Sequence, residues 1–146
     1  MKLSTRTRYG VRLMVMLASR YDEGPVYLRE IAEEEQISKK YLSQIIIPLR
    51  AAGLVHSTRG AYGGYTLAKA PEDITMKDVI EVLEGEACLV DCVKNPAVCM
   101  RVTTCATRDI WTILGEKIGE TLKAVTLAAL VRMSRDKEQN ILMSHI

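Results

Sequence analysis

The order of hydrophobic periods in the first seventy residues restricts the fold more than any other feature of the sequence. Apolar residues recur at helical spacing over residues 5–21, over 28–36 and again from Ser38 onward. Two short alternating stretches, 54–57 and 65–68, then flank a glycine-rich turn, and this pattern predicts a β-hairpin. Three helices followed by a two-stranded hairpin form the element order of a winged helix-turn-helix.

The pattern of apolar residues in the second half of the chain predicts further helices and one irregular segment. A helix begins after Thr75, where Asp78 has the spacing that completes a capping box. A long apolar stripe predicts a helix over residues 104–124, and a short helix follows at 126–133. Residues 84–103 have no steady period, so we expect a loop there.

We therefore expect a mainly α fold with a small β-hairpin, divided into four parts. These are a winged helix-turn-helix over residues 1–84, a cysteine-containing loop over 85–105, a long helix with a short packing helix over 104–133, and a flexible tail over 134–146.

Composition excludes several classes of protein. The 146 residues are 48% hydrophobic and 26% charged, which is typical of one soluble domain, and the lack of Phe predicts an aliphatic core. No stretch is apolar enough to cross a bilayer and no cleavable signal peptide is evident, so we expect no membrane association and a cytoplasmic location. We find no nucleophile–base pair and no catalytic histidine, so an enzyme is not expected.

Basic residues gather in the first half of the chain. Residues 1–70 contain 11 Lys and Arg against 6 Asp and Glu, whereas residues 71–146 contain 9 against 12. Such a basic half is compatible with a polyanionic partner and equally with an ordinary solvated surface.

The start of the third helix carries side chains suited to double-stranded DNA. A helix N-terminus attracts phosphate, lysine and glutamine side chains match guanine and adenine edges, and an arginine at a hairpin tip can enter a minor groove. Each residue also has a plain structural interpretation, such as helix capping for Ser38. The candidate DNA-binding residues are Ser38, Lys39, Lys40, Tyr41, Ser43, Gln44 and Arg59.

All four cysteines lie within one window of 18 residues, at Cys88, Cys92, Cys99 and Cys105. In a reducing compartment such a group is more often metal-binding or redox-active than a set of disulfides. Zinc sites favour closely paired cysteines, and only the first pair has that spacing. Thiolates separated by five or six residues suit a segment that wraps an iron–sulfur cluster.

Several motifs together resemble the Rrf2 family of bacterial winged-helix transcriptional regulators, and the match covers residues 1–133. They are Met1-Lys2-Leu3-Ser4, Arg8-Tyr9-Gly10-Val11-Arg12, Leu28-Arg29-Glu30-Ile31-Ala32, Ala52-Gly53-Leu54-Val55 and Arg59-Gly60-Ala61-Tyr62-Gly63-Gly64-Tyr65. The resemblance implies a homodimer in which the long C-terminal helices cross between subunits. It also implies base contacts from Ser38, Lys40 and Ser43 and a minor-groove contact from Arg59.

The resemblance is IscR-like in the cysteine window, where it implies that Cys92, Cys99 and Cys105 hold an iron–sulfur cluster. The fourth ligand is open, because Arg108 stands where this branch has a histidine and an arginine cannot ligate iron. Cys88 is the available thiolate, and Asp91 and Glu86 are weaker candidates. A small buried hydrophobe at a helix end is an equal interpretation of Cys88. Whether the cluster is 2Fe-2S or 4Fe-4S is not specified by the spacing.

Three functional hypotheses follow. The first is a homodimeric regulator, such as a repressor, whose DNA binding is controlled by an iron–sulfur cluster that senses iron, oxygen, nitric oxide or cluster supply. The second is a cluster-free regulator of the same fold that acts as a thiol redox sensor or responds to a metabolic partner. The third is an iron–sulfur electron carrier, which would have no use for the basic helix start or for Arg59.

Overall fold

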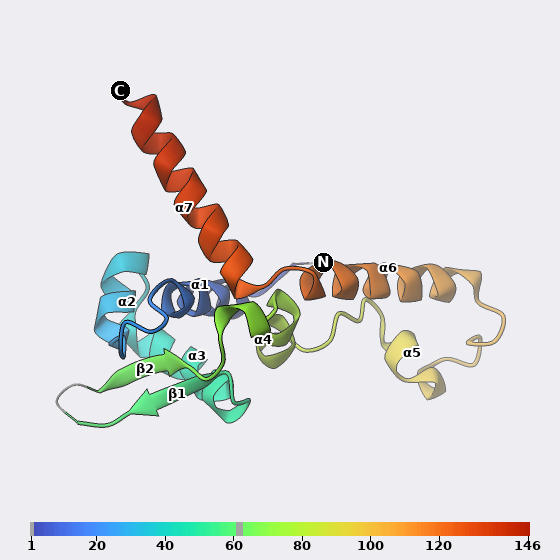
Figure 1. The fold of residues 1–146 in the computed structure, drawn as a ribbon. Helices are drawn as coiled ribbons and strands as arrows, with labels where there is room; N and C mark the ends of the chain where they lie inside the picture. Colours follow the sequence, from blue (N-terminus) through green and yellow to red (C-terminus); the bar gives the residue numbers. More distant parts are fainter. Residues whose placement is uncertain (1, 61–62) are drawn as a thin grey trace.

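A computed structural model describes residues 2–60 and 63–146 (Figure 1). The fold is mainly helical with one two-stranded antiparallel sheet, as the sequence predicts. The elements in chain order are α1 (Thr5–Ser19), α2 (Leu28–Glu35), α3 (Lys39–Ala51), β1 (Val55–Thr58), β2 (Gly64–Leu67), η1 (Pro71–Asp73), α4 (Met76–Leu83), α5 (Asp91–Lys94), η2 (Pro96–Val98), α6 (Ala106–Lys123) and α7 (Leu127–Ser144).

The turn between α2 and α3 is set by two local features. Gln36 ends α2 in the left-handed conformation, with a φ of 55°. Ser38 then caps α3, because its side-chain oxygen accepts a hydrogen bond from the Tyr41 N–H at 3.0 Å. The side chain of Ile37 between them is buried, so the turn is also fixed to the core.

The hairpin pairs Val55 with Leu67 and Thr58 with Gly64. It is extended on one side by Val26, whose N–H and C=O both bond to the backbone of Tyr65, at 2.9 and 2.8 Å. Gly64 has a φ of 150°, and an added Cβ would lie 2.7 Å from the Val26 oxygen, so a glycine is required at this crossing. Ala61 and Tyr62, which belong to the predicted turn motif, lie outside the described residues.

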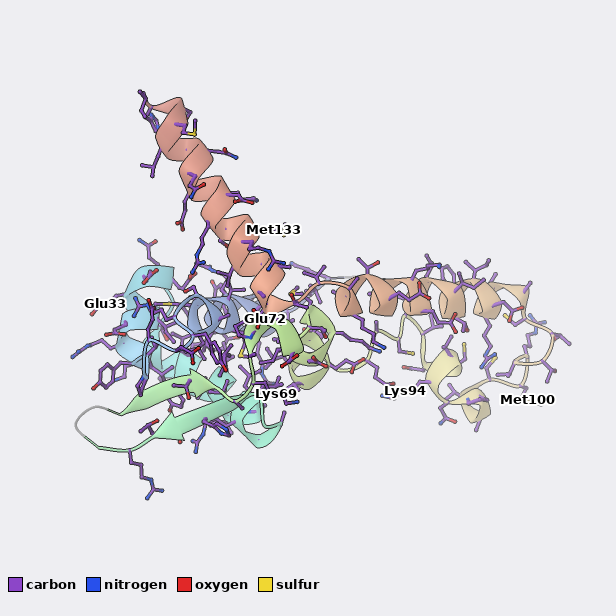
Figure 2. The ribbon with its side chains drawn as sticks, viewed as in Figure 1. Glu33, Lys69, Glu72, Lys94, Met100 and Met133 are labelled. Carbon is purple, nitrogen blue, oxygen red and sulfur yellow. The ribbon has the colours of Figure 1, made fainter. Side chains whose placement is uncertain are left out.

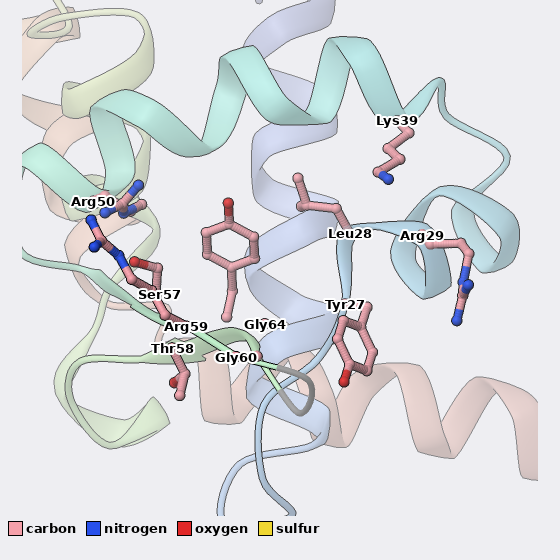
Figure 3. Close-up of a pocket in the computed structure, with 12 residues that line it drawn as sticks. Tyr27, Leu28, Arg29, Lys39, Arg50, Ser57, Thr58, Arg59, Gly60 and Gly64 are labelled. Carbon is pink, nitrogen blue, oxygen red and sulfur yellow. The ribbon is translucent and has the colours of Figure 1, made fainter.

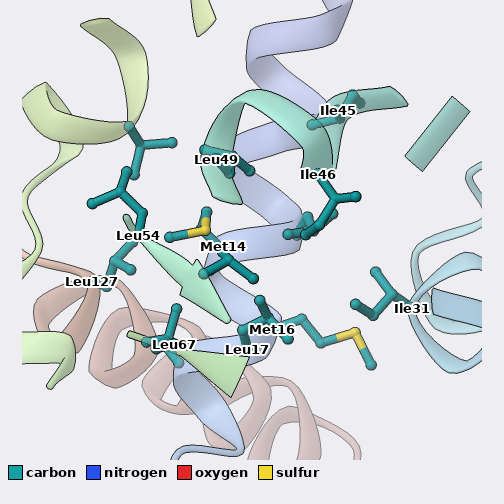
Figure 4. Packing of buried hydrophobic residues seen from close by; sticks show 14 of the residues in the cluster. Met14, Met16, Leu17, Ile31, Ile45, Ile46, Leu49, Leu54, Leu67 and Leu127 are labelled. Carbon is teal, nitrogen blue, oxygen red and sulfur yellow. The ribbon is translucent and has the colours of Figure 1, made fainter. Parts of the chain in front are cut away.

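The core lies where α1, α3, α4, the hairpin and the start of α7 meet (Figure 4). More than one side of α1 contributes to it, because the neighbouring residues Leu13 and Met14 point in different directions and both are fully buried. Leu127 of α7 is also fully buried, although it follows α1 by more than a hundred residues. We refer to this unit as the body.

Two backbone hydrogen bonds join the start of α4 to the start of α7. The Met76 N–H donates to the Val125 oxygen at 2.8 Å, and the Leu127 N–H donates to the Ile74 oxygen at 2.9 Å. The capping box predicted for α4 is present, with Thr75 as the N-cap and Asp78 as its partner. The chain therefore returns to the body beside the start of α4, whereas it leaves the body after the end of that helix.

Residues 85–125 form an arm that extends away from the body (Figures 1 and 2). The predicted loop contains two short helices, α5 and η2, and the predicted long helix is α6. None of α5, η2 and α6 contains a buried residue. Among the described residues, no helix is both long and apolar enough to span a bilayer.

The predicted short helix and flexible tail are wrong in extent, because residues 134–144 continue α7 as helix. Arg135, Lys137 and Glu138 are good helix formers, so the segment needs no buried stripe to remain helical in the structure. Met133 and Ile141 of this helix are more than half exposed, and Figure 1 shows α7 projecting from the body.

Candidate nucleic-acid interface and cysteine segment

The solvent-facing side of α3 carries most of the predicted DNA-binding residues. Lys40, Ser43, Gln44 and Ile47 recur at intervals of three and four residues, so they form one stripe, which we call the base face. The opposite side of the helix is anchored in the core by four buried residues, Leu42, Ile45, Ile46 and Leu49. That anchoring holds the base face outward and fixes its rotation about the helix axis.

Three of the predicted residues make internal contacts in the structure. Ser38 caps α3, as described above. The Ser43 hydroxyl donates to the Lys40 oxygen at 2.6 Å, so its proton is used within the helix. The half-buried Tyr41 ring stacks edge-on against Tyr9, with ring centroids 5.9 Å apart. Tyr41 therefore has a packing role in addition to any contact with DNA.

A groove of about 710 Å³ lies between the hairpin and the helices α2 and α3 (Figure 3). Of the predicted residues it contains Lys39, from the start of α3, and Arg59, from the end of β1. The hairpin tip turns at Gly60, which has a φ of 108°, and the Gly63 N–H closes the turn by donating to the Gly60 oxygen at 3.0 Å. The turn thus presents Arg59 beside the groove.

Sequence reasoning missed two further cations that line the same groove, Arg29 and Arg50. No acidic residue lines this groove within the described chain, and none of the ion pairs found there involves its four cations. An unpaired cluster of cations favours a polyanion, because a phosphate backbone supplies the missing charge. Arg50 follows Lys39 by three helical turns, and that spacing was a signal available in the sequence.

The four cysteines all lie in the cysteine segment (residues 85–105), which covers the start of the arm, and all four are free thiols. Cys88 donates to the Val90 oxygen at 3.1 Å, and Cys92 lies in α5. Cys99 is exposed at the end of η2, and Cys105 is the N-cap residue of α6. In the described residues, no three Cys, His, Asp or Glu side chains converge as a ready set of metal ligands.

Cys105 has the most distinctive electrostatic environment of the four thiols. The Thr107 hydroxyl, whose oxygen lies 3.2 Å from the Cys105 sulfur, is the main cause that lowers the pKa of this thiol, and the nearby Arg108 backbone N–H adds to it. Cys105 stands at a helix N-terminus, where N–H groups without helical partners favour a thiolate.

Arg108 of α6 holds the short helix α5 of the cysteine segment. Its Nε donates to the Cys92 backbone oxygen at 3.0 Å, which fixes α5 against the start of α6. Further along α6, an added Cβ at Gly115 would lie 2.8 Å from the Ala87 oxygen. A larger residue there would push the segment away from the helix, so the contact depends on glycine.

The residue that precedes the cysteine segment contacts the N-terminus of α1. One oxygen of Glu84 accepts hydrogen bonds from the Ser4 N–H at 3.2 Å, from the Ser4 hydroxyl at 2.6 Å and from the Thr7 hydroxyl. These bonds lower the pKa of Glu84, the Ser4 hydroxyl being the largest cause. Gly85, with a φ of 97°, then turns the chain into the arm.

The C-terminal end of α4 also packs against α1 at the point where α1 contacts α3, the DNA-facing helix. Gly10 of α1 lies against Leu83 and Ile45, with no room for a side chain next to Leu83. Ile45 belongs to the buried side of α3. Contacts therefore run continuously from the start of the arm, through α1, to the helix that carries the base face.

The family model named Rrf2, described as an iron-dependent transcriptional regulator, matches residues 3–133. The chain belongs to the Rrf2 family. Like its relatives it is a transcriptional regulator and not an enzyme. This membership confirms the resemblance inferred from the sequence motifs and removes the electron-carrier hypothesis.

Individual family members match over nearly the whole chain. The transcriptional regulator CymR of Bacillus subtilis is 40% identical over 146 residues, 100% of both chains. The structure of that protein, the global cysteine regulator, covers 91% of this chain and 98% of its own, with a TM-score of 0.79.

Two other solved structures are similar. That of T. potens IscR is 40% identical, covers 92% of this chain and 88% of its own, and has a TM-score of 0.77. The oxidised form of Staphylococcus aureus CymR is 37% identical over 90% of this chain and 96% of its own, with a TM-score of 0.72.

Proposed function

We propose that this protein is a homodimeric, cytoplasmic transcriptional regulator whose affinity for an operator is set by an iron–sulfur cluster held in the cysteine segment. The single observation that carries the proposal is the contact between Glu84 and the N-terminus of α1, because Glu84 immediately precedes the cysteine segment and ties the start of that segment to the DNA-facing body. DNA binding itself follows from family membership and from the unpaired cations of the groove.

The chemistry of the donor set fits such a cluster. Four reduced thiols lie on one segment built of short turns, and three of them, Cys92, Cys99 and Cys105, are joined by links of five or six residues. Cys88 is the proposed fourth ligand, because Arg108 is engaged with the Cys92 backbone and stays protonated. A bound cluster supplies a redox-sensitive group whose loss or oxidation changes which thiols are tied together.

The residues of the chain then carry that change to the body. When the thiols of the cysteine segment come together, its first residue, Gly85, moves and takes the neighbouring Glu84 with it. Loss of the Glu84 contact leaves the N–H and hydroxyl groups at the start of α1 without their acceptor, and α1 shifts against Leu83 and Ile45. Two states of one contact, biased by the state of the segment, are sufficient for allosteric control.

The direct test is the iron and acid-labile sulfide content per chain, with a visible spectrum, of the full chain purified without oxygen. Stoichiometric iron and sulfide with charge-transfer absorption are expected, and the iron count identifies a 2Fe-2S or a 4Fe-4S cluster. Cys99→Ala should abolish both signals, whereas the neighbouring Val98→Ala should keep them. Colourless, iron-free wild-type protein would contradict the proposal, and an unchanged spectrum in Cys88→Ala would remove Cys88 as the fourth ligand.

The route of control has its own test. In Glu84→Gln the iron content should stay at the wild-type level, whereas the difference in operator affinity between the cluster-loaded and cluster-free forms should shrink. An unchanged difference would mean that the signal reaches α3 by another route. Glu72→Gln, which removes an exposed carboxylate of the body outside the cysteine segment, is the matched control.

A second candidate function is a regulator that uses the bare thiols as a redox sensor. The similarity to CymR, a cysteine regulator that also has an oxidised form in Staphylococcus aureus, favours it. Two thiols and one peroxide molecule would give a disulfide and two waters. Iron-free protein should then lose or gain operator affinity on treatment with peroxide, with a mass loss of about 2 Da per chain for one internal disulfide. Unchanged affinity after complete oxidation would exclude this mode.

A further inference from the structure

The base face contains an exposed aliphatic side chain that the proposed DNA contacts do not account for. Ile47 is 62% exposed, although it lies in the middle of a helix whose four other leucine and isoleucine residues are buried in the body. It follows Ser43 and Gln44 by one helical turn and therefore shares their direction. Among the described residues of the base face it is the one aliphatic member.

The surroundings of Ile47 indicate which kind of partner covers it. It lines a groove of about 530 Å³ between α3 and β1, whose wall also includes Arg50 and Ser57 and holds no acidic residue in the part of the chain that the structure describes. Lys40 precedes it on the same face, and Arg59 lies beside the neighbouring groove. This charge pattern complements a nucleic acid more closely than it complements a second copy of the chain or an apolar protein surface.

The hydrogen-bonding side chains of the base face do not identify thymine, so an apolar contact is the remaining way to distinguish this base. The Ser43 hydroxyl spends its proton on the Lys40 oxygen, so it offers only acceptor capacity to a base. Gln44 can recognise adenine and Lys40 guanine, but neither identifies thymine. Thymine is marked in the major groove by its C5-methyl group, which favours an aliphatic contact.

We infer that Ile47 determines sequence specificity by packing against the C5-methyl group of one thymine in each operator half-site. This inference rests on the proposed DNA-binding function and adds a residue and a base to it. Burial of one methyl group is worth about 0.8 kcal/mol, which corresponds to about a fourfold change in Kd.

The test uses the full chain and duplexes that differ by one methyl group. Selection from a random duplex library with wild-type protein first gives the consensus operator. Each thymine of that operator is then replaced singly by deoxyuridine, which lacks only the methyl group, and Kd is measured at fixed salt. We expect one position per half-site where the replacement weakens wild-type binding about fourfold and leaves the binding of Ile47→Ala unchanged.

The control variant and each result that would contradict the inference give different readouts in this experiment. Ile141→Ala, which shortens an equally exposed isoleucine on α7, should keep the wild-type preference for thymine. A consensus operator without any Ile47-dependent methyl effect would overturn the inference and leave the proposed function intact. A change of oligomeric state in Ile47→Ala without a methyl effect would assign the face to a protein contact instead. Failure of the selection to give any consensus would overturn the inference and the proposed function together.

Discussion

The body and the arm of this protein are built from equally apolar helices, yet they use their apolar residues in opposite ways. In the body, α1 and α3 bury four or more residues each, and Leu13, Leu42 and Ile45 have no exposed surface. In the arm, α6 is longer than either and buries none. Ile110, Ile113 and Leu114 of α6 are all more than 40% exposed.

The direction of these exposed residues explains the difference. Gly115, Gly119 and Thr112 face the cysteine segment and α4, because they line the groove between those elements and α6. Leu114 lies with Trp111 beside Cys88, Leu89 and Val90 of the cysteine segment. Ile110 and Ile113 do not line the groove and are about half exposed, so they are the candidate contact with another chain. The body thus completes its packing within one chain, and the arm is proposed to complete its packing in the homodimer.

The largest expected effect is on the free energy of unfolding, which should respond differently to truncations in the body and in the arm. Leu42→Ala should cost about 2–5 kcal/mol of unfolding free energy, because it opens a cavity in a closed core. A truncation on the exposed side of the arm helix, Ile110→Ala, should lower the free energy of unfolding by an amount that shrinks as the protein is diluted and the dimer dissociates. Urea unfolding at several protein concentrations measures both, and equal, concentration-independent losses would erase the distinction between body and arm.

A charge on the outer side of α6 should separate the subunits. Ile113→Glu places a carboxylate in the proposed interface, where its desolvation opposes association. Sedimentation equilibrium should show wild-type dimers and Ile113→Glu monomers with an intact circular dichroism spectrum. Val98→Glu, at a residue of the arm that is 59% exposed but outside α6, should remain dimeric. Dimers in both variants would move the interface elsewhere.

Removal of one cation from the body should weaken DNA binding, whereas removal of one from the arm should not. Arg59→Ala should raise the Kd for the operator by about tenfold or more, since an arginine contact in a groove is worth roughly 1–3 kcal/mol. Arg101→Ala removes a guanidinium from the arm and is the matched control. Fluorescence anisotropy over a salt series measures both, and unchanged affinity in Arg59→Ala would exclude the hairpin from the interface.

The smallest expected effect lies at the junction of the two regions. The pKa of Glu84 is held below 4.5 by its bonds to Ser4 and Thr7, so their contribution to stability is present above that pH and is lost as the pH falls through the lowered pKa. Wild type should therefore melt slightly higher than Glu84→Gln at pH 7, and the two should converge in acid. The effect is small because the carboxylate is exposed to solvent. A difference in melting temperature between the two proteins that persists at pH 2 would mean that the charge of Glu84 does not contribute to stability.

The body could be predicted from the sequence because each of its elements has a local signal. Ser38 begins α3 as its N-cap, Asp78 completes the predicted capping box, and the glycine turn gives the hairpin. The predicted start of α1 at Thr5 is confirmed as well. These signals depend only on neighbours within one helical turn or one β-turn.

The parts that were missed depend on contacts between distant residues or on weak patterns. Arg29 and Arg50 reach one groove only because the hairpin folds back over α2 and α3. The four residues of α5 are too few to show a helical period, and the polar second half of α7 has no buried stripe to reveal it. The contact between Glu84 and Ser4 joins residues 80 positions apart, which no local pattern encodes.

The burial of Leu127 has a consequence for the order of events during synthesis. A ribosome releases the chain from its N-terminus, so every residue of the base face and the hairpin emerges before the cysteine segment and α6. The core that holds α3 in place nevertheless lacks Leu127 and Val131 until both have emerged. A nascent or prematurely ended chain that lacks the arm therefore also has an incomplete DNA-binding body. The order of the elements along the chain thus disfavours a product that binds the operator but lacks the cysteine segment.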